Sequence, residues 1–482
     1  MITLQTADLL RILPEIVLSA FGVLVMVLEP FVEAAHKKLL GWLAVLGVLA
    51  AGAATFRTSL DPGMAFGGAL AADGFSFYFI YLFLLVAGLV ILGSMDYLER
   101  DHIQHGEYYA LVLLGTVGMC FMAASTDLIM IFLGLEISSI STYILAGFRR
   151  QDRVSNEASL KYFLLGSFAT AFFLFGIAWV YGLTGTTNLL GIRAQLAGPG
   201  QWSRFAIVAL VLMFVGLAFK LSTVPFQIWT PDVYQGSPAP VAAFLSVGPK
   251  AAAFAILLRV FVGSFAGASG VTFQLLWVSA ALTMCVGNLA ALWQSNIKRL
   301  LAYSSIAHAG YILVGLAAGG SRGVSAVMYY LVAYSLMNVG AFILIAHLAS
   351  TGERLVEIED YKGLGAERPA VAACLAVLFL SLAGIPTTAG FLGKFYLFRA
   401  AMHSHLVGLT VLALLNSTVS VYYYLRVIIA MYMREGKTET SAAVLPWPVR
   451  VVLATSILGI FYLGLAPNLL VGISSLTLPL PR

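Results

Sequence analysis

The sequence predicts an all-α, polytopic membrane protein whose helices cross the bilayer about fourteen times. Only 10% of its 482 residues are charged and 60% are hydrophobic, whereas soluble domains carry about 25% charged residues. Apolar windows of about 19 residues, long enough to cross hydrocarbon, recur along the whole chain. Prolines interrupt two of these windows close to a lysine, which predicts two discontinuous helices. We therefore expect residues 1–482 to form a single transmembrane domain.

The predicted spans follow one another with short connections. The first run, residues 12–28, resembles a signal peptide, but it lacks a small-residue cleavage site and Glu29 and Pro30 end it, so we interpret it as a retained helix. Only residues 125–127 separate the fourth and fifth spans, which must therefore be antiparallel neighbours. Charge, glycine or proline bounds most of the predicted spans, which cover residues 10–28, 39–56, 74–95, 108–124, 126–148, 157–183, 204–230, 239–262, 272–293, 299–318, 323–350, 370–400, 405–432 and 447–473.

The basic residues of the connections predict an orientation. Lysine and arginine are about twice as frequent in the connections after odd-numbered spans as on the opposite side. Basic connections remain in the cytoplasm, so both termini are expected outside it.

The lysine and proline pattern occurs twice. Lys220 precedes Pro225 in FKLSTVPFQIW, and Lys394 follows Pro386 in GIPTTAGFLGKF, about five spans further along. Because five is odd, the two copies would be inverted, and paired discontinuous helices in inverted repeats mark the ion sites of transporters. The expected parts are helices 1–3 in residues 1–107, a first repeat in 108–262, a second inverted repeat in 272–432, and helix 14 in 447–473, with helices 7 and 12 discontinuous.

Three lysines lie deep within apolar runs, namely Lys220, Lys250 and Lys394. An ammonium in hydrocarbon costs several kcal/mol, so each is a candidate functional residue. Burial without a fixed carboxylate favours the neutral amine, which lets the group gain and lose a proton. Snorkelling to the membrane surface is the alternative, and it suits Lys161, near the start of its helix, better than Lys220 or Lys250.

A carboxylate, Glu136, lies about ten residues past Asp127, or about 15 Å into the bilayer. We expect it to pair with Lys220 or with Lys161. A static ion pair that only joins helices is the alternative.

A histidine, His308, lies near mid-membrane in AYSSIAHAGY. Its position between lysines suits a proton relay, and a hydrogen-bonded core histidine is the alternative. We interpret Lys298 and Arg299 as positive-inside anchors. Hydroxyls for a water chain can come from Tyr303, Ser304, Ser305 and Tyr311.

Several function classes are disfavoured. Cys120, Cys285 and Cys374 are far apart in apolar runs and predict neither a disulfide framework nor a zinc site. No dinucleotide, P-loop or haem motif is present, so we expect no cofactor and no metal in this chain. The net charge of +5 is spread over membrane connections, which argues against a nucleic-acid surface.

The stretch from Phe219 to Ala252, with five prolines and two lysines in an apolar setting, is the most specific in the chain. Together with Glu136, AYSSIAHAGY and GIPTTAGFLGKF, it resembles the antiporter-like membrane subunits of respiratory complex I over nearly the whole chain. Within that family, the lysine at position 394 favours the N branch over the M branch, which has a glutamate there. The end of the chain at Arg482 disfavours the L branch, which continues into a lateral helix.

The resemblance implies a proton-translocating subunit of NADH-quinone oxidoreductase in a bacterial inner membrane, with both termini periplasmic. It implies a relay through Glu136, Lys220, Lys250 and Lys394, with Lys161 and His308 at additional positions. NADH, FMN, iron–sulfur clusters and quinone would bind partner subunits, and the neighbours would be subunits M, J and K. A subunit of a free-standing cation/proton antiporter is the rival interpretation. A purely structural scaffold is disfavoured by the number of intramembrane ionisable residues.

Overall fold

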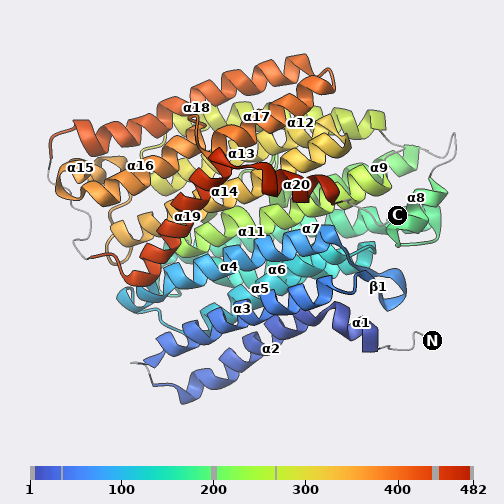
Figure 1. Ribbon diagram of the computed structural model, residues 1–482, viewed down its shortest axis with the longest axis horizontal. Helices are drawn as coiled ribbons and strands as arrows, with labels where there is room; N and C mark the ends of the chain where they lie inside the picture. The colour runs from blue at the N-terminus through green and yellow to red at the C-terminus, as the bar shows by residue number, and fades with distance from the viewer. Residues whose placement is uncertain (1–5, 34–35, 197–203, 266–268, 437–443, 478–482) are drawn as a thin grey trace.

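The computed structural model describes residues 6–33, 36–196, 204–265, 269–436 and 444–477, and Arg482 lies outside them. These residues form one bundle of long helices that lie roughly side by side (Figure 1). The helices of the first half are α1 Thr6–Arg11, α2 Leu13–Leu28, α3 Lys38–Ser59, α4 Gly74–Arg100, α5 Gly106–Ala124, α6 Leu128–Ala146, α7 Arg153–Thr184, α8 Leu189–Gln195, α9 Arg204–Leu221, α10 Trp229–Gly236 and α11 Ala239–Leu257. Those of the second half are α12 Ser269–Leu292, α13 Ile297–Ala318, α14 Gly320–Leu348, α15 Leu364–Glu367, α16 Pro369–Ala383, α17 Ala389–His403, α18 Val407–Met433, α19 Trp447–Leu465 and α20 Asn468–Leu476.

The predicted all-α membrane fold is confirmed. Among the described residues, 13 helices are long and apolar enough to cross a membrane. The predicted span 370–400 is divided between α16 and α17, each 15 residues long, which together make a fourteenth crossing.

Two crossings are interrupted where the sequence places a proline. The seventh changes from α9 to α10 across residues 222–228, which include Pro225. The twelfth changes from α16 to α17 across residues 384–388, which include Pro386. Each interruption leaves carbonyls at the end of the first half-helix without their usual partners.

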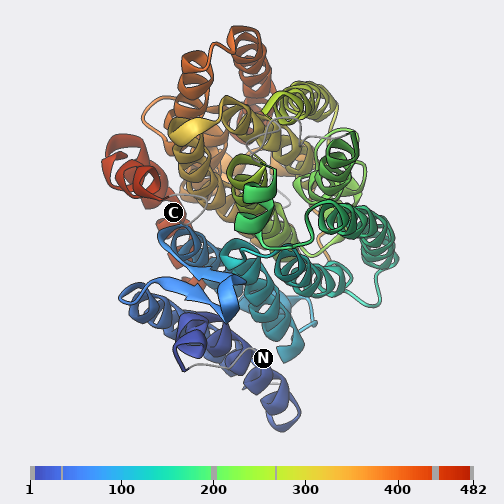
Figure 2. The same ribbon diagram turned by 90° about the vertical axis from the view of Figure 1, so that its right-hand side faces the viewer.

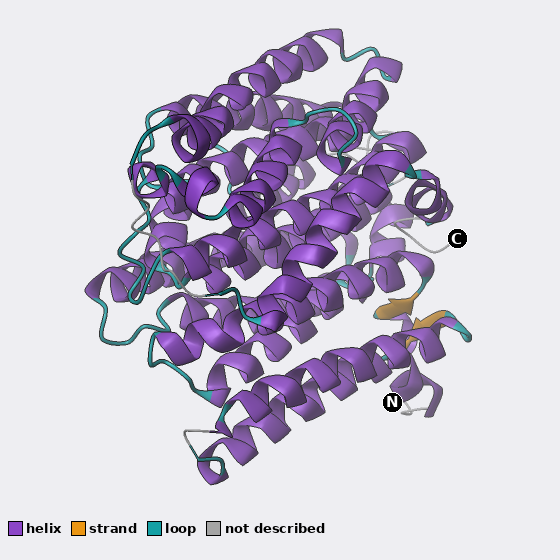
Figure 3. Ribbon diagram, turned by 60° about the vertical axis from the view of Figure 1, so that its left-hand side comes forward, coloured by secondary structure: helices purple, strands orange, loops and turns teal. Residues whose placement is uncertain are grey.

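Two local features differ from the sequence prediction. A short hairpin of β1 Gly63–Ala65 and β2 Leu70–Ala72 connects α3 to α4 (Figure 3). Its turn uses Gly67 and Gly68 at positive φ, which glycine adopts at little cost. The predicted last helix over 447–473 is also wrong in its extent, because α19 ends at Leu465 and α20 begins only after Pro467, which cannot continue a helix.

The centre of the bundle is formed by α11, α13 and α14. The apolar window of Ala239–Ser264, which is α11 and a following π-helical turn, is 100% buried, and those of α13 and α14 are each 89% buried. Helices at the rim, such as α7 and α18, bury less than half of theirs. A view turned by 90° shows many helices nearly end-on, grouped around this centre (Figure 2). A charged residue in the middle of α11 or α13 is therefore shielded from lipid.

The connections alternate between the two ends of the bundle, as an even number of crossings requires. At one end, Lys37 pairs with Glu29 at 2.5 Å, and Glu29 also accepts from the Gly106 amide at 2.7 Å. At the other end, Asn188 and Thr126 both donate to the Gly68 carbonyl at 2.8 Å. Helix α1, where the described chain begins, lies on that second side, because its Asp8 accepts a hydrogen bond from the Phe66 amide at 3.1 Å.

Candidate functional site

The lysine at the first interruption is enclosed by aromatic rings. Lys220 lies in the last turn of α9 and is 4% exposed. Its ammonium is 4.9 Å from the ring centre of Tyr143 and 5.0 Å from that of Tyr162, within range for cation–π attraction. The Tyr162 hydroxyl is 3.5 Å away, at the outer limit of a hydrogen bond. Lys220 therefore has polarisable neighbours but no tight partner among the described residues.

The predicted carboxylate faces the same space without a direct ion pair. Glu136 on α6 is the acidic group whose charge acts on Lys220, but no ion pair within 4.0 Å joins the two. Its Oε1 atom and the Tyr143 hydroxyl are both buried, with no hydrogen bond in the described part of the chain. Buried polar atoms of this kind are usually satisfied by ordered water. The structure thus gives Glu136 and Lys220 an electrostatic rather than a contact relationship.

The structure places Lys161 elsewhere. Its ammonium pairs with Glu157 at 2.7 Å and with Asp232 at 2.9 Å, and its side chain is 42% exposed. Asp232, on the half-helix α10, also accepts from Arg299 at 2.7 Å. The alternative pair of Glu136 with Lys161 is therefore absent from the described residues, and Lys161 is a half-exposed residue near one end of the bundle.

Aromatic side chains join the first lysine to the second. The Tyr162 ring stacks on Trp229 at 4.5 Å between centres, and Trp229 meets Tyr234 at 6.1 Å. Tyr234 in turn lies 5.7 Å from the Lys250 ammonium. Trp229 also donates its indole N–H to the Phe219 carbonyl at 3.0 Å, which satisfies an end of α9 left open by the interruption. Helix α10 therefore positions the aromatic residues between two buried lysines.

The second lysine is buried at the centre. Lys250 on α11 is 3% exposed and follows Pro249, which lies inside the helix. Its ammonium donates to the Ser305 carbonyl at 3.2 Å and also to the Ser305 hydroxyl. Ser305 belongs to α13, so α13 connects Lys250 to the histidine one turn later.

The histidine lies among tyrosines. His308 is 1% exposed, its Nδ1 is 2.5 Å from the Tyr330 hydroxyl, and its Nε2 is 3.1 Å from that of Tyr424. Its charged form would be repelled by both Lys250 and Lys394, since both act on it electrostatically. Ser304 hydrogen-bonds to the Tyr424 hydroxyl, which extends the network.

The third lysine reaches back to the second interruption. Lys394 on α17 is 4% exposed and donates to the carbonyls of Leu382 and Ala383, at 3.0 and 2.9 Å, at the end of α16. It also donates to the Ser417 hydroxyl at 3.0 Å and lies 5.1 Å from the Tyr311 ring centre. The ammonium therefore compensates the partial negative charge of a helix C-terminus.

These contacts arrange five of the six predicted ionisable residues in one file through the bundle. The order is Glu136, Lys220, Lys250, His308 and Lys394, and Lys161 stands apart. Of the hydroxyl-bearing residues expected from α13, Ser304 and Ser305 contact this file through their hydroxyls and Tyr311 through its ring, whereas Tyr303 contacts Arg299 instead. Sequence reasoning missed the tyrosines from other helices, namely Tyr143, Tyr162, Tyr234, Tyr330 and Tyr424.

A second charged cluster at one end of the bundle was also missed. Lys298, interpreted from the sequence as a surface anchor, has a side chain only 1% exposed and pairs with Glu353 at 2.5 Å. Glu353 also pairs with Arg149 at 3.0 Å and accepts from the Ala239 amide at 2.6 Å, the first residue of α11. Lys298 further donates to the Ser237 carbonyl at 2.6 Å. The cluster thus fixes the junction of α10 and α11, between the first two lysines.

We expect Glu353→Gln to destabilise the protein by about 3–5 kcal/mol, because it leaves the buried Lys298 and Arg149 without their counter-charge. Burial is the largest single effect and raises the pKa of Glu353, but the charges of Lys298 and Arg149 together with the hydrogen bonds from Lys298 and Tyr97 outweigh it, so the pKa lies below the usual glutamate value of 4.5. The stabilisation is therefore complete above that value and is lost as the pH falls through the lower folded-state pKa. Thermal inactivation of the assembled protein at several pH values measures both effects.

A matched control is Glu359→Gln. Its partners Lys362 and Arg434 and its own side chain are all at least 36% exposed, so we expect a change below about 1 kcal/mol. Equal losses in the two variants would contradict a special role for the Glu353 cluster.

Comparisons with known proteins give the geometry a context. A family model described as NADH:quinone oxidoreductase/Mrp antiporter, TM, matches residues 125–420. The chain is 50% identical over 463 residues to NADH-quinone oxidoreductase subunit N 1 of Solibacter usitatus, covering 96% of this chain and 95% of that protein. It is 45% identical over 467 residues to NADH-quinone oxidoreductase subunit N of Trichlorobacter lovleyi, covering 97% and 96%. A chain of respiratory complex I from Thermus thermophilus with bound aureothin has a TM-score of 0.81 and 37% identity, covering 96% of this chain and 99% of that chain.

Proposed function

The chain belongs to the family of NADH:quinone oxidoreductase and Mrp antiporter membrane subunits, and we propose that it is the N-type, proton-translocating subunit of an NADH-quinone oxidoreductase. The family description includes both oxidoreductase and antiporter subunits. The relatives at 45–50% identity over nearly the full length favour the oxidoreductase over a free-standing antiporter.

The observation that carries the proposal is the file of buried ionisable groups. Lys220, Lys250 and Lys394 are each at most 4% exposed, yet none has a carboxylate within ion-pair distance among the described residues. A buried ammonium without a counter-charge is costly, so small changes in its surroundings shift its protonation. His308 lies between the second and third lysines, where a neutral imidazole can accept a proton on one nitrogen and release one from the other.

In this chain, protons would be moved by changes in charge along the file. A change at the Glu136 end alters the field at Lys220, whose contacts are aromatic rings rather than a fixed anion. That change alters the proton affinity at Lys250, which is linked through Ser305 and α13 to His308. Lys394 completes the file. Its hydrogen bond to the Leu382 carbonyl at the end of α16 connects its charge to the second interruption. The coupling is therefore electrostatic and conformational.

The remaining parts of the proposal concern the surroundings of the chain. We place it in the bacterial inner membrane with both termini periplasmic, because basic residues favour the opposite side. Its neighbours would be subunits M, J and K, and NADH, FMN, iron–sulfur clusters and quinone would bind other subunits. Deleting the gene and restoring it with a tagged copy tests this. Co-purification of NADH:quinone oxidoreductase activity with the tagged chain is expected, whereas cation/proton exchange without that activity would favour the antiporter.

A double-mutant cycle tests the link between the first two groups. Glu136→Gln should impair coupled turnover at neutral pH, because it removes the charge that acts on Lys220. Combined with Lys220→Met, it should be no worse than the more severe single variant, since groups that act together are non-additive. Rates of NADH-driven acidification in inverted membrane vesicles provide the measurement. Strictly additive losses would show that the two residues act independently.

A further inference from the structure

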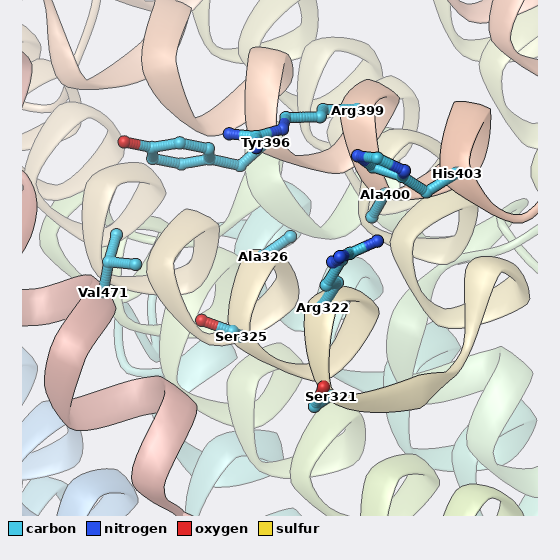
Figure 4. A pocket seen from close by; sticks show the side chains of 9 residues that line it. All are labelled: Ser321, Arg322, Ser325, Ala326, Tyr396, Arg399, Ala400, His403 and Val471. Carbon is cyan, nitrogen blue, oxygen red and sulfur yellow. The ribbon is translucent and has the colours of Figure 1, made fainter.

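A cationic cavity lies outside the file of buried charges, beyond Lys394 toward the end of α17. It has a volume of about 250 Å³ and lies between the start of α14, the end of α17 and the short helix α20 (Figure 4). Arg322 contributes from α14, and Arg399 and His403 from α17, with Tyr396 and Ser321 at its edges. Figure 4 shows the side chains of Arg322, Arg399 and His403 on the side of the cavity between α14 and α17.

The two arginines have no counter-charge in the described residues. Neither Arg322 nor Arg399 forms an ion pair or hydrogen bond there, and no carboxylate lines the cavity. By contrast, Arg149 and Arg299 each pair with carboxylates. Two like charges brought together from positions 77 residues apart in the sequence repel one another unless an anion lies between them.

The cavity lies at the depth of the membrane surface. Helix α14 begins after Gly319, and α17 ends at His403, where the Ser404 hydroxyl donates to the Ala318 carbonyl at 2.8 Å. Both helices are membrane crossings or half-crossings, so their ends lie where lipid phosphates are found. The amide groups at the start of α14 add further positive potential.

A short helix provides an apolar side to the cavity. Helix α20 follows Pro467 and is held to α14 by a hydrogen bond between the Ser474 and Ser325 hydroxyls at 2.6 Å. It lines the cavity with Val471 and exposes Leu469 (63%) and Ile473 (44%). Leu469 and Ile473 are four residues apart, so they lie on the same face of α20. The cavity is therefore cationic on one side and apolar on the other.

We propose that this cavity binds the phosphate group of an anionic phospholipid, with Arg322 and Arg399 on the phosphate and the acyl chains along the apolar face of α20. Arginine binds phosphate oxygens with paired N–H donors. Basic pockets between transmembrane helices recognise anionic headgroups in this way.

The test uses the assembled complex in nanodiscs with a photoreactive phosphatidylglycerol analogue and peptide mapping. Cross-links are expected on the α17 and α20 segments. The double variant Arg322→Gln, Arg399→Gln should weaken labelling roughly twenty-fivefold, because each basic residue near an anionic headgroup contributes about fivefold. Arg193→Gln is the matched control, since Arg193 is exposed on α8 and lies outside the cavity.

The other outcomes would overturn the proposal. Equal labelling by a phosphatidylcholine analogue would show that the charge is not recognised. Displacement of the label by millimolar inorganic phosphate alone would assign the cavity to a free anion. A carboxylate of a neighbouring subunit found between the two arginines in a structure of the complex would assign it to a protein contact. Unchanged labelling in the double variant would remove both arginines from the site.

Discussion

Lys220→Ala is expected to abolish proton pumping while the complex still assembles. Lys220 is 4% exposed at the end of α9, and its ammonium lies against Tyr143 and Tyr162 rather than against an anion. The substitution removes the only ammonium of the described residues at the first interruption, so the electrostatic change at Glu136 has no group to act on. A positioned side chain in a proton transfer contributes about 10²–10⁴-fold, so the loss should be of that order.

The measurement is NADH-driven acidification of inverted vesicles, read together with the amount of assembled complex in the same membranes. Lys362→Ala is the control, because this substitution also removes one positive charge, but from an exposed ion pair with Glu359. Normal acidification by Lys220→Ala vesicles would make Lys220 a structural residue. If Lys220→Ala fails to assemble, pumping is measured in Lys220→Met instead, because methionine keeps most of the apolar stem and removes the charge.

The sequence predicted the crossings well because each crossing is an independent apolar run. Its errors lie where local chemistry competes with that pattern. Pro467 divides the last span, and the Gly67 and Gly68 turn makes a hairpin in a segment that hydropathy leaves as a loop. The inverted arrangement of the two repeats stays a prediction, since it rests on the odd number of spans between the interruptions.

The candidate site was predictable in part for a physical reason. A lysine or glutamate in an apolar run is conspicuous, so Glu136, Lys220, Lys250 and Lys394 stand out in the sequence. Tyrosine is common in apolar runs and carries no such signal, although Tyr162 and Tyr424 turn out to contact the file. Lys161 pairs with Asp232, 71 residues away, in addition to Glu157 four residues before it. Lys298 pairs with Glu353, 55 residues away. No spacing rule connects either lysine to its distant partner.

The second interruption has an energetic consequence that sequence reasoning did not provide. Helix α16 ends at Ala383, and the amides of Gly384 and Ile385 bond only to the carbonyls of Leu380 and Ser381. The carbonyls of Leu382 and Ala383 receive their hydrogen bonds from Lys394. Each buried carbonyl left unsatisfied would cost about 1–3 kcal/mol. Lys394 therefore holds the end of α16, and this role is separable from the proton transfer that we propose for it.

Three substitutions of Lys394 separate these roles. Lys394→Ala should lose both, with less assembled complex and little pumping, because two carbonyls and the Ser417 hydroxyl lose their donor. Lys394→Met should behave in the same way, which would show that the apolar stem is not the cause. Lys394→Arg keeps a cation and several donors, so assembly should be close to normal. Its guanidinium stays protonated, however, and pumping should remain slow.

The decisive comparison is therefore between assembly and pumping in Lys394→Arg. Both are measured in the same vesicle preparation, with Lys362→Arg as the control at an exposed site. Slow pumping with normal assembly would show that the ammonium must release its proton during turnover. Wild-type pumping in Lys394→Arg would mean that a fixed positive charge at the end of α16 is sufficient. In that case the proton path inside this chain would end at Lys250 and His308, and Lys394 would act on it only through its charge.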